Sequence, residues 1–232
     1  MRFLYVEDIV IPEARNWTER LSVKMEREFE SVPADAYAPE MEADMVFFAT
    51  TSNRRRIQHW LNLSRDVRIP YFFLTPQMRF PSDPSSPVLS GVLTPVTMLE
   101  EEVHKAELLS HLARYTDTAI TLLTANDYGS RARTNTGKIH TFLQTRQADL
   151  GKTFVIYEQT AKADSMSLHK ELYNVQTYKP TNLQIDLIFW TASRDYGLDD
   201  LIFGPAEQKL IRHSVVPVAL LNPRGDLYSL CD

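Results

Sequence analysis

The sequence is poor in cysteine and contains no long apolar run. Cys231 is the single cysteine among 232 residues, so no disulfide bond can form within the chain. A chain without disulfides fits a reducing compartment. No stretch reaches the roughly 18 consecutive apolar residues that a membrane-spanning helix requires. We therefore expect a cytoplasmic protein that has no membrane partner.

Positive charge is also scarce. Lysine and arginine number 25 against 30 aspartates and glutamates, which gives a formal net charge of −5. Non-specific nucleic-acid binding depends on a cationic surface that neutralises phosphates, so we expect no nucleic-acid partner. With 44% hydrophobic and 24% charged residues, the composition is that of a globular protein with an apolar core.

Glycine is limited to 7 residues, and no Gly-x-Ser-x-Gly hydrolase elbow occurs. The tripeptide at 151–153, Gly-Lys-Thr, matches the end of a phosphate-binding P-loop, but Arg146 stands where that loop requires glycine. His104 and His111 lie seven residues apart without the further ligands of a zinc site. We therefore expect neither an enzyme nor a metal site.

Apolar runs of strand length recur along the chain, and segments of helical periodicity separate them. Runs without polar alternation are typical of strands that are covered on both faces. Their alternation with helices predicts an α/β fold, an open and mostly parallel sheet with helices on both faces. The predicted strands are 3–6, 45–49, 71–74, 92–96, 120–123, 154–157, 187–190 and 216–221. The predicted helices are 12–29, 53–66, 100–115, 138–150, 165–175 and 205–213.

The clearest break in the chain is 81–87, where three prolines and three serines occur in seven residues. Such a segment continues neither a helix nor a central strand. It predicts a linker at 81–89 between an N-terminal unit, 1–80, and a C-terminal domain, 90–232.

The two units share a pattern. Asp44 is followed by a strand, a helix, Pro70 and another strand, and Asp186 is followed by the same order around Pro217. The aspartate and the proline are 26 residues apart in the first copy and 31 in the second. Two generic βαβ units would share this order, but the matched aspartates and prolines favour an internal repeat.

The C-terminal part also matches a known family. The stretch Val-Leu-Thr-Pro-Val-Thr-Met-Leu-Glu at 92–100 is similar to an opening "VLVPVDxSE", and 186–221 aligns without a gap to a closing stretch that begins "DLIVMGSRG". Over residues 90–223 the sequence resembles a universal stress protein domain. Residues 1–80 resemble only the last strands and helices of a second domain, which implies a truncated first unit. The matched positions near the end are Leu198, Leu201, Gly204, Arg212, His213 and Pro217.

The resemblance implies where a nucleotide would bind. ATP-binding members of the family carry Gly-x2-Gly-x9-Gly-[Ser/Thr] after the fourth strand and an acid after the first, and such glycines let backbone N–H groups approach phosphates. This chain has Pro205 at the hydroxyl position, which offers neither an N–H nor a hydroxyl. We therefore expect a degenerate site and no ATP cofactor bound in the family's way. The positions that match or lie within this site are Thr97, Thr191, Arg194, Gly197, Gly204 and Pro205.

Family members pair through their last strands, and this chain has two such strands, 71–74 and 216–221. Exposed apolar strand edges need a partner. The resemblance therefore implies either a homodimer or an internal pseudo-dimer through the last strands, and both remain open.

The first functional hypothesis is a universal stress protein-like, non-catalytic stress-response protein that acts through dimerisation or partner binding. The alternative is a protein that binds ATP or AMP, or is a weak ATPase, through a variant loop at 191–205. A third hypothesis is a sensor of a small anion that uses Arg194 and the arginines at 54–56. A basic pocket at the carboxyl ends of the strands would favour the third, because ligands bind there in open α/β sheets.

Overall fold

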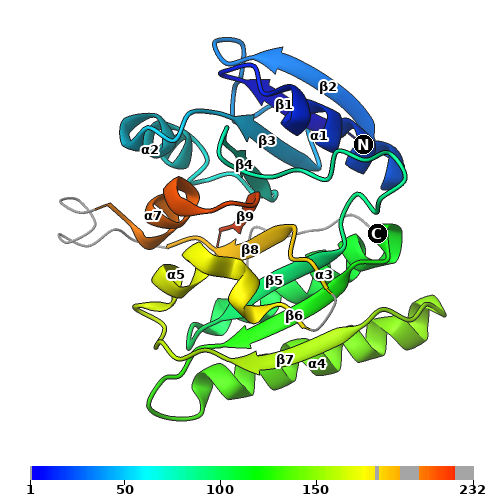
Figure 1. Cartoon of the computed structure of the whole chain (residues 1–232), viewed down its shortest axis with the longest axis vertical. Helices are drawn as coiled ribbons and strands as arrows, with labels where there is room; N and C mark the ends of the chain where they lie inside the picture. The colour runs from blue at the N-terminus through cyan, green and yellow to red at the C-terminus, as the bar shows by residue number, and fades with distance from the viewer. Residues whose placement is uncertain (1, 181–182, 194–203, 223–232) are drawn as a thin grey trace.

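The computed structural model describes residues 2–180, 183–193 and 204–222. Nine strands form one sheet in the order β2-β1-β3-β4-β9-β8-β5-β6-β7 (Figure 1). The strands are β1 (Arg2–Glu7), β2 (Glu28–Pro33), β3 (Met45–Ala49), β4 (Tyr71–Leu74), β5 (Gly91–Val96), β6 (Ala119–Thr124), β7 (Ile156–Thr160), β8 (Leu187–Thr191) and β9 (Val218–Leu221). The helices are α1 (Pro12–Lys24), α2 (Arg54–Leu63), α3 (Lys105–Thr116), α4 (Arg131–Leu150), α5 (Leu168–Glu171) and α7 (Ala206–His213), with 3₁₀ turns η1 (Glu100–His104) and η2 (Leu172–Tyr178).

Neighbouring strands of the sheet run parallel except at one junction. There β4 pairs with β9 in the antiparallel direction, with Tyr71 opposite Leu220 and Phe73 opposite Val218. The seven other neighbouring pairs are parallel. Of the two pairings that the sequence left open for these strands, the structure has the pairing within the chain.

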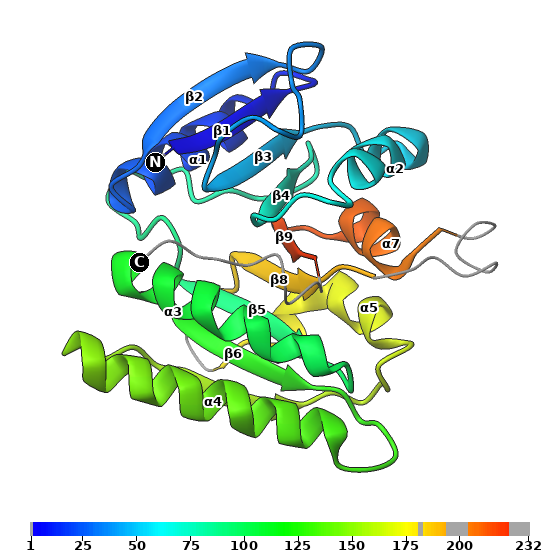
Figure 2. The same ribbon diagram turned by 180° about the vertical axis from the view of Figure 1, so that it is seen from behind.

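Helices cover both faces of the sheet, which confirms the predicted fold class. Residues of α1, α3 and α4 pack in one core, for example Trp17, Leu109 and Ile139. Residues of α2, η2 and α7 pack in the core on the other face, for example Trp60 and Leu172. Figure 2, seen from behind, shows α3 and α4 in front of the sheet, whereas Figure 1 shows α5 and α7 there.

Successive residues of β3 illustrate why the central strands have continuous apolar sequences. Phe47 stacks on Phe72 at 4.4 Å between ring centroids, on the side of α1. Phe48 stacks on Trp60 of α2 at 4.8 Å, on the opposite side. Because side chains alternate between the two faces of a strand and both faces are covered, every position of β3 is apolar.

Several predicted boundaries are wrong. The predicted helix 12–29 ends at Lys24, and Glu28–Pro33 forms β2, a strand that the sequence did not predict. The predicted helix 138–150 begins seven residues earlier, at Arg131, and the strand predicted at 154–157 lies at Ile156–Thr160. The helix predicted over 165–175 divides into the short α5 and the 3₁₀ turn η2.

The proline- and serine-rich segment runs from β4 to β5 against helix α1. The Arg20 guanidinium donates to the carbonyl oxygens of Pro81 and Ser86 over 2.6 and 2.8 Å. The indole of Trp17 donates to the carbonyl oxygen of Val88 over 2.8 Å. None of the described helices has the length and apolarity needed to cross a membrane.

Candidate functional site

Two of the predicted site residues meet at the carboxyl ends of β5 and β8. These strands are parallel neighbours, with Val92 opposite Leu187, so their carboxyl ends lie at the same edge of the sheet. Thr97 directly follows β5 and Thr191 is the last residue of β8, and each is 6% exposed. Arg194 and Gly197 lie outside the described residues.

Glu102 connects the two threonines. One carboxylate oxygen accepts hydrogen bonds from the Thr97 amide, at 3.2 Å, and from the Thr97 hydroxyl. The other oxygen accepts from the Thr191 hydroxyl over 2.8 Å. A carboxylate of this chain therefore occupies the space between the two strand ends.

Lys105 neutralises this carboxylate. Its ammonium group forms an ion pair with Glu102 and donates to the carbonyl oxygen of Pro95 in β5. Lys105 is fully buried and Glu102 is 2% exposed. Burial lowers the pKa of Lys105, and the Glu102 carboxylate acts in the opposite direction. Separation of such a buried pair leaves an uncompensated charge in the protein interior.

Helix α4 fixes the loop that carries Thr97. The side-chain amide of Asn135 donates to the carbonyl oxygens of Thr97 and Leu99 over 3.0 and 2.7 Å. Asn135 is 4% exposed, so these bonds are formed in the interior. The loop after β5 is thus held from α4 and from Glu102.

The predicted residues Gly204 and Pro205 lie at the start of α7. Gly204 has a φ of +79°, a left-handed conformation that favours glycine, and a Cβ atom there would also displace the side-chain oxygen of Gln208, which would lie 2.0 Å away. Pro205 is the N-cap of α7 and makes no side-chain cap. The Glu207 carboxylate accepts from the amide and the hydroxyl of Ser193, at 3.2 and 2.8 Å. An acid of the chain thus lies in the first turn of α7, where the helix dipole favours an anion.

A related arrangement in the N-terminal half was not predicted. Asp8 follows β1 as Thr97 follows β5, and its carboxylate accepts from the Thr50 hydroxyl, after β3, over 2.6 Å. The same carboxylate forms an ion pair with Arg56, and Arg56 Nε donates to it over 2.7 Å. Burial raises the pKa of Asp8, but hydrogen bonds from Arg56, Thr50 and Trp60 outweigh burial and hold it below the usual range.

The arginines at 54–56 therefore differ in their surroundings. Arg56 faces Asp8, and Asn53 caps α2 by accepting from the backbone amide of Arg55 over 2.8 Å. The side-chain amide of Gln208 in α7 donates to the carbonyl oxygen of Arg54 over 3.2 Å. Helices α2 and α7 consequently begin side by side (Figure 1). Among the described residues, no group of three or more His, Cys, Asp or Glu side chains could hold a metal ion.

No protein-family model matches the sequence, and no curated protein matches it. Solved structures do match. A universal stress protein from Archaeoglobus fulgidus DSM 4304 superposes with a TM-score of 0.52 at 14% identity, over 97% of this chain and 88% of that chain. The chain has a universal stress protein-like fold. A protein of unknown function from Pseudomonas aeruginosa PAO1 matches with a TM-score of 0.49 at 14% identity, over 97% and 82% of the two chains. A universal stress protein in complex with cAMP matches 59% of this chain and 98% of its own, at 13% identity and a TM-score of 0.43.

Within this universal stress protein-like fold, Glu102, Lys105 and Asp8 are the site residues that sequence reasoning missed. Glu102 lies at the start of the helix that the sequence predicts over 100–115. The signal was its spacing, because Glu102 and Lys105 lie three residues apart directly after a strand, where side chains on one turn can pair. Asp8 directly follows an apolar run, as Thr97 does.

Proposed function

We propose that the chain is a universal stress protein-like, non-catalytic stress-response protein that acts through a partner and binds no ATP at its strand ends. The likeness in fold supports the first part of the proposal. The second part rests on one observation, the buried Glu102 carboxylate that bridges Thr97 and Thr191. These two threonines stand at the positions that the family uses around a nucleotide.

The Glu102 bridge gives nucleotide binding an energetic cost. A nucleotide that contacts both strand ends must displace Glu102 from Thr191 or approach its carboxylate with phosphates. Loss of a hydrogen bond to a charged group costs about 1.5–3 kcal/mol, which lowers an affinity by a factor of about 10 to 150. In the second case the phosphates meet a carboxylate, and Lys105 reduces the resulting repulsion.

The loops at the same edge of the sheet supply a surface that suits a protein partner. Met98, Leu99, Tyr128 and Met166 are 41%, 46%, 109% and 78% exposed, and they follow β5, β6 and β7. Ser165 ties these loops together, because it accepts from the Met98 amide over 3.2 Å and donates its own amide to Asp127 over 2.8 Å. Exposed apolar side chains on a fixed frame favour contact with another macromolecule.

The test is a titration of the whole chain with ATP and AMP by isothermal calorimetry. We expect no saturable heat up to about 1 mM nucleotide, a concentration that detects even weak sites. Binding with a micromolar Kd would contradict the proposal and favour the alternative of a nucleotide-binding protein. Thr191→Val would then identify the site, because it should abolish binding, whereas Thr145→Val on the exposed face of α4 should leave binding unchanged.

The oligomeric state tests the remaining choice between dimerisation and binding of another partner. Because β4 and β9 pair within the chain, the last strands need no second copy. Sedimentation should therefore give a mass near the 26.7 kDa of one chain. A stable dimer would favour dimerisation as the mode of action.

A further inference from the structure

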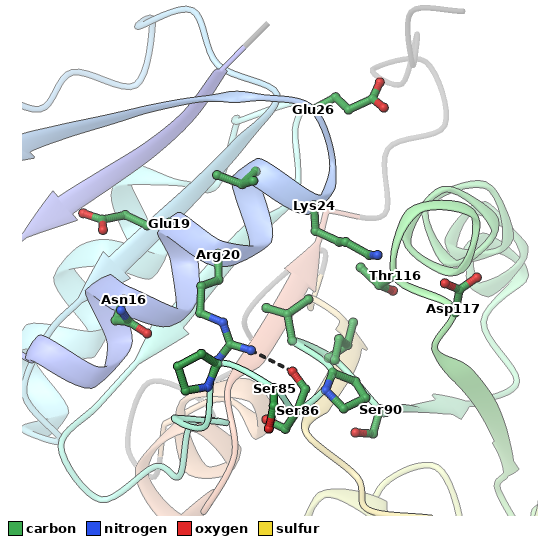
Figure 3. Close-up of a pocket in the computed structure, with 15 residues that line it drawn as sticks. Asn16, Glu19, Arg20, Lys24, Glu26, Ser85, Ser86, Ser90, Thr116 and Asp117 are labelled. Atoms are coloured by element: carbon green, nitrogen blue, oxygen red, sulfur yellow. Dashed lines mark hydrogen bonds between the residues drawn. The ribbon is translucent and has the colours of Figure 1, made fainter.

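A groove lies far from the Glu102 site, at the opposite end of β5. Its volume is about 860 Å³, within the range of small-molecule sites. Helix α1 forms one wall, the segment 84–90 forms the floor, and the end of α3 closes one side (Figure 3). The carboxyl edge that carries Thr97 is separated from Ser90 by the whole length of β5, about 20 Å.

The floor of the groove is fixed, and it carries three serines beside Pro84, Pro87, Val88 and Leu89. Val88 and Leu89 are 6% and 0% exposed and belong to the core. The Trp17 indole and the Arg20 guanidinium hold this segment by hydrogen bonds to its backbone carbonyls. The groove is therefore largely formed before a ligand arrives, which reduces the entropy cost of binding.

The acidic side chains of the groove are mostly paired with cations outside it. Glu19 bonds to Arg15 over 3.1 Å on the same helix, and Asp117 bonds to Lys152 over 2.9 Å. Glu26 lies at the end of α1 with a left-handed backbone, and Figure 3 shows its side chain directed away from Arg20. These pairings reduce the negative charge that a ligand would meet.

The basic side chains of the groove, in contrast, form no close ion pairs with the described residues. Arg20 and Lys24 lie four residues apart on α1, so both face the same side of the helix. Within the described part of the chain, neither forms an ion pair with a carboxylate at 4.0 Å or less. Asp83 lies near Arg20, since hydrogen bonds from Ser85 and, to a smaller degree, the Arg20 charge lower the pKa of its carboxyl. Arg20 uses its guanidinium on two carbonyl oxygens, and its remaining N–H donors are available for an acceptor. The Lys24 ammonium extends across the groove toward the end of α3 (Figure 3).

We infer that this groove binds a small organic anion, a phosphate or carboxylate on an apolar body. The anionic group lies between Arg20 and Lys24, and the apolar body rests on the exposed Val23, Pro84 and Pro87. Lys24 is the last residue of α1, whose carbonyl end disfavours an anion, so the anionic group lies closer to Arg20 than to Lys24. This inference does not depend on the proposed function, because the two sites share no residue.

The test uses phenyl phosphate and benzoate as probes and benzamide as an uncharged analogue, with the full chain observed by ¹H–¹⁵N NMR. We expect at least one of the anions to shift the amide signals of Lys24, Ser86 and Ser90 in a saturable way, with a Kd below about 10 mM. Benzamide should bind at least about tenfold more weakly. Comparison of the two anions distinguishes a phosphate site from a carboxylate site.

Lys24→Gln supplies the matched variant, because Lys24 is exposed and no described contact depends on it. It should weaken the anion about fivefold, as expected for one partly exposed charge contact, and Lys24→Arg should restore binding. The exposed Lys170→Gln on α5 should change nothing. The inference is overturned if benzamide binds as well as the anions, if Lys24→Gln leaves the Kd unchanged, or if neither anion shifts these signals.

Discussion

Tyr71 of β4 donates its phenol proton over 2.8 Å to the side-chain oxygen of Asn222, the residue that follows β9. The side-chain amide of Asn222 in turn donates to the carbonyl oxygens of Ser64 and Val67 over 2.7 and 2.8 Å. Tyr71 and Asn222 are 1% and 4% exposed. One asparagine therefore satisfies three polar groups and joins the antiparallel junction to the segment after α2.

Asn222→Leu should destabilise the fold strongly. The substitution removes three hydrogen bonds and leaves the Tyr71 hydroxyl and two carbonyl oxygens without these partners in the interior. We expect the free energy of unfolding, measured by urea titration, to fall by about 2–4 kcal/mol. Asn62→Leu on the exposed face of α2 is the control and should change it by less than about 0.5 kcal/mol. Equal effects of the two substitutions would contradict the stabilising role of the Asn222 hydrogen bonds.

Glu102→Gln and Lys105→Met should each be costly, since each leaves a buried partner without its counter-charge. We expect each to lower the free energy of unfolding by about 3–5 kcal/mol. The double variant removes both charges, so its loss should be clearly smaller than the sum of the two single losses. Chemical denaturation of all four proteins completes the cycle. Additive losses would show that the two side chains do not stabilise one another.

His169 should make the protein less stable in mild acid. It is 6% exposed, and neither ring nitrogen has a hydrogen-bond partner among the described residues. Burial holds its pKa below the ordinary 6.5, and Lys209, Lys170 and His213 act in the same direction, against a smaller opposing effect of the Met166 backbone. Below about pH 6.5 the unfolded chain binds a proton that the folded chain does not, so the free energy of unfolding should fall as the pH decreases.

The measurement is urea unfolding at about pH 8 and about pH 5, the range in which histidine titrates. His169→Leu cannot take up the proton, so it should lose less stability than the unsubstituted chain between these two pH values. At the higher pH the imidazole is neutral in both states, and this measurement isolates the packing effect of the substitution. The same loss in both proteins would exclude His169 as the source.

Gly91→Ala and Gly137→Ala should have opposite effects. A Cβ atom at Gly91 would lie 2.5 Å from the carbonyl oxygen of Gln184, so the start of β5 must shift. We expect a loss of about 1–3 kcal/mol in the free energy of unfolding. At Gly137, inside α4, a Cβ atom meets no atom within 4 Å, and alanine should stabilise the helix by about 0.5–1 kcal/mol. Thermal unfolding followed by circular dichroism measures both changes. A lower Tm for Gly137→Ala would contradict the predicted stabilisation of α4.

The sequence predicted the central strands because burial on both faces leaves an unmistakable apolar run, as in β3. It missed β2 because an edge strand needs less burial. In Glu28–Pro33 only Val32 is buried, the two end residues are exposed, and two of the six residues are glutamates. The helix predicted over 12–29 was too long because no glycine marks its end. Glu26 adopts the left-handed conformation there instead, with a φ of +58°.

The candidate site was predictable only in part. Thr97 and Thr191 could be brought together from sequence, since the carboxyl ends of parallel neighbours share an edge. The identity of the group between them depends on how η1 folds back over β5, which no local pattern specifies. Glu102 and Lys105 therefore emerged only from the three-dimensional arrangement. Asp8 had a usable signal, because it follows its strand as Thr97 does.

Because β4 and β9 belong to one polypeptide, the amount of this protein in a cell does not determine whether their contact forms. A contact between separate chains weakens on dilution, and its occupancy follows the amount of protein present. A contact between two segments of the same chain forms at a fixed effective concentration. The continuous sheet should therefore be as complete in a cell that holds few copies of this protein as in one that holds many. Control by abundance must then act on the number of molecules, not on their assembly.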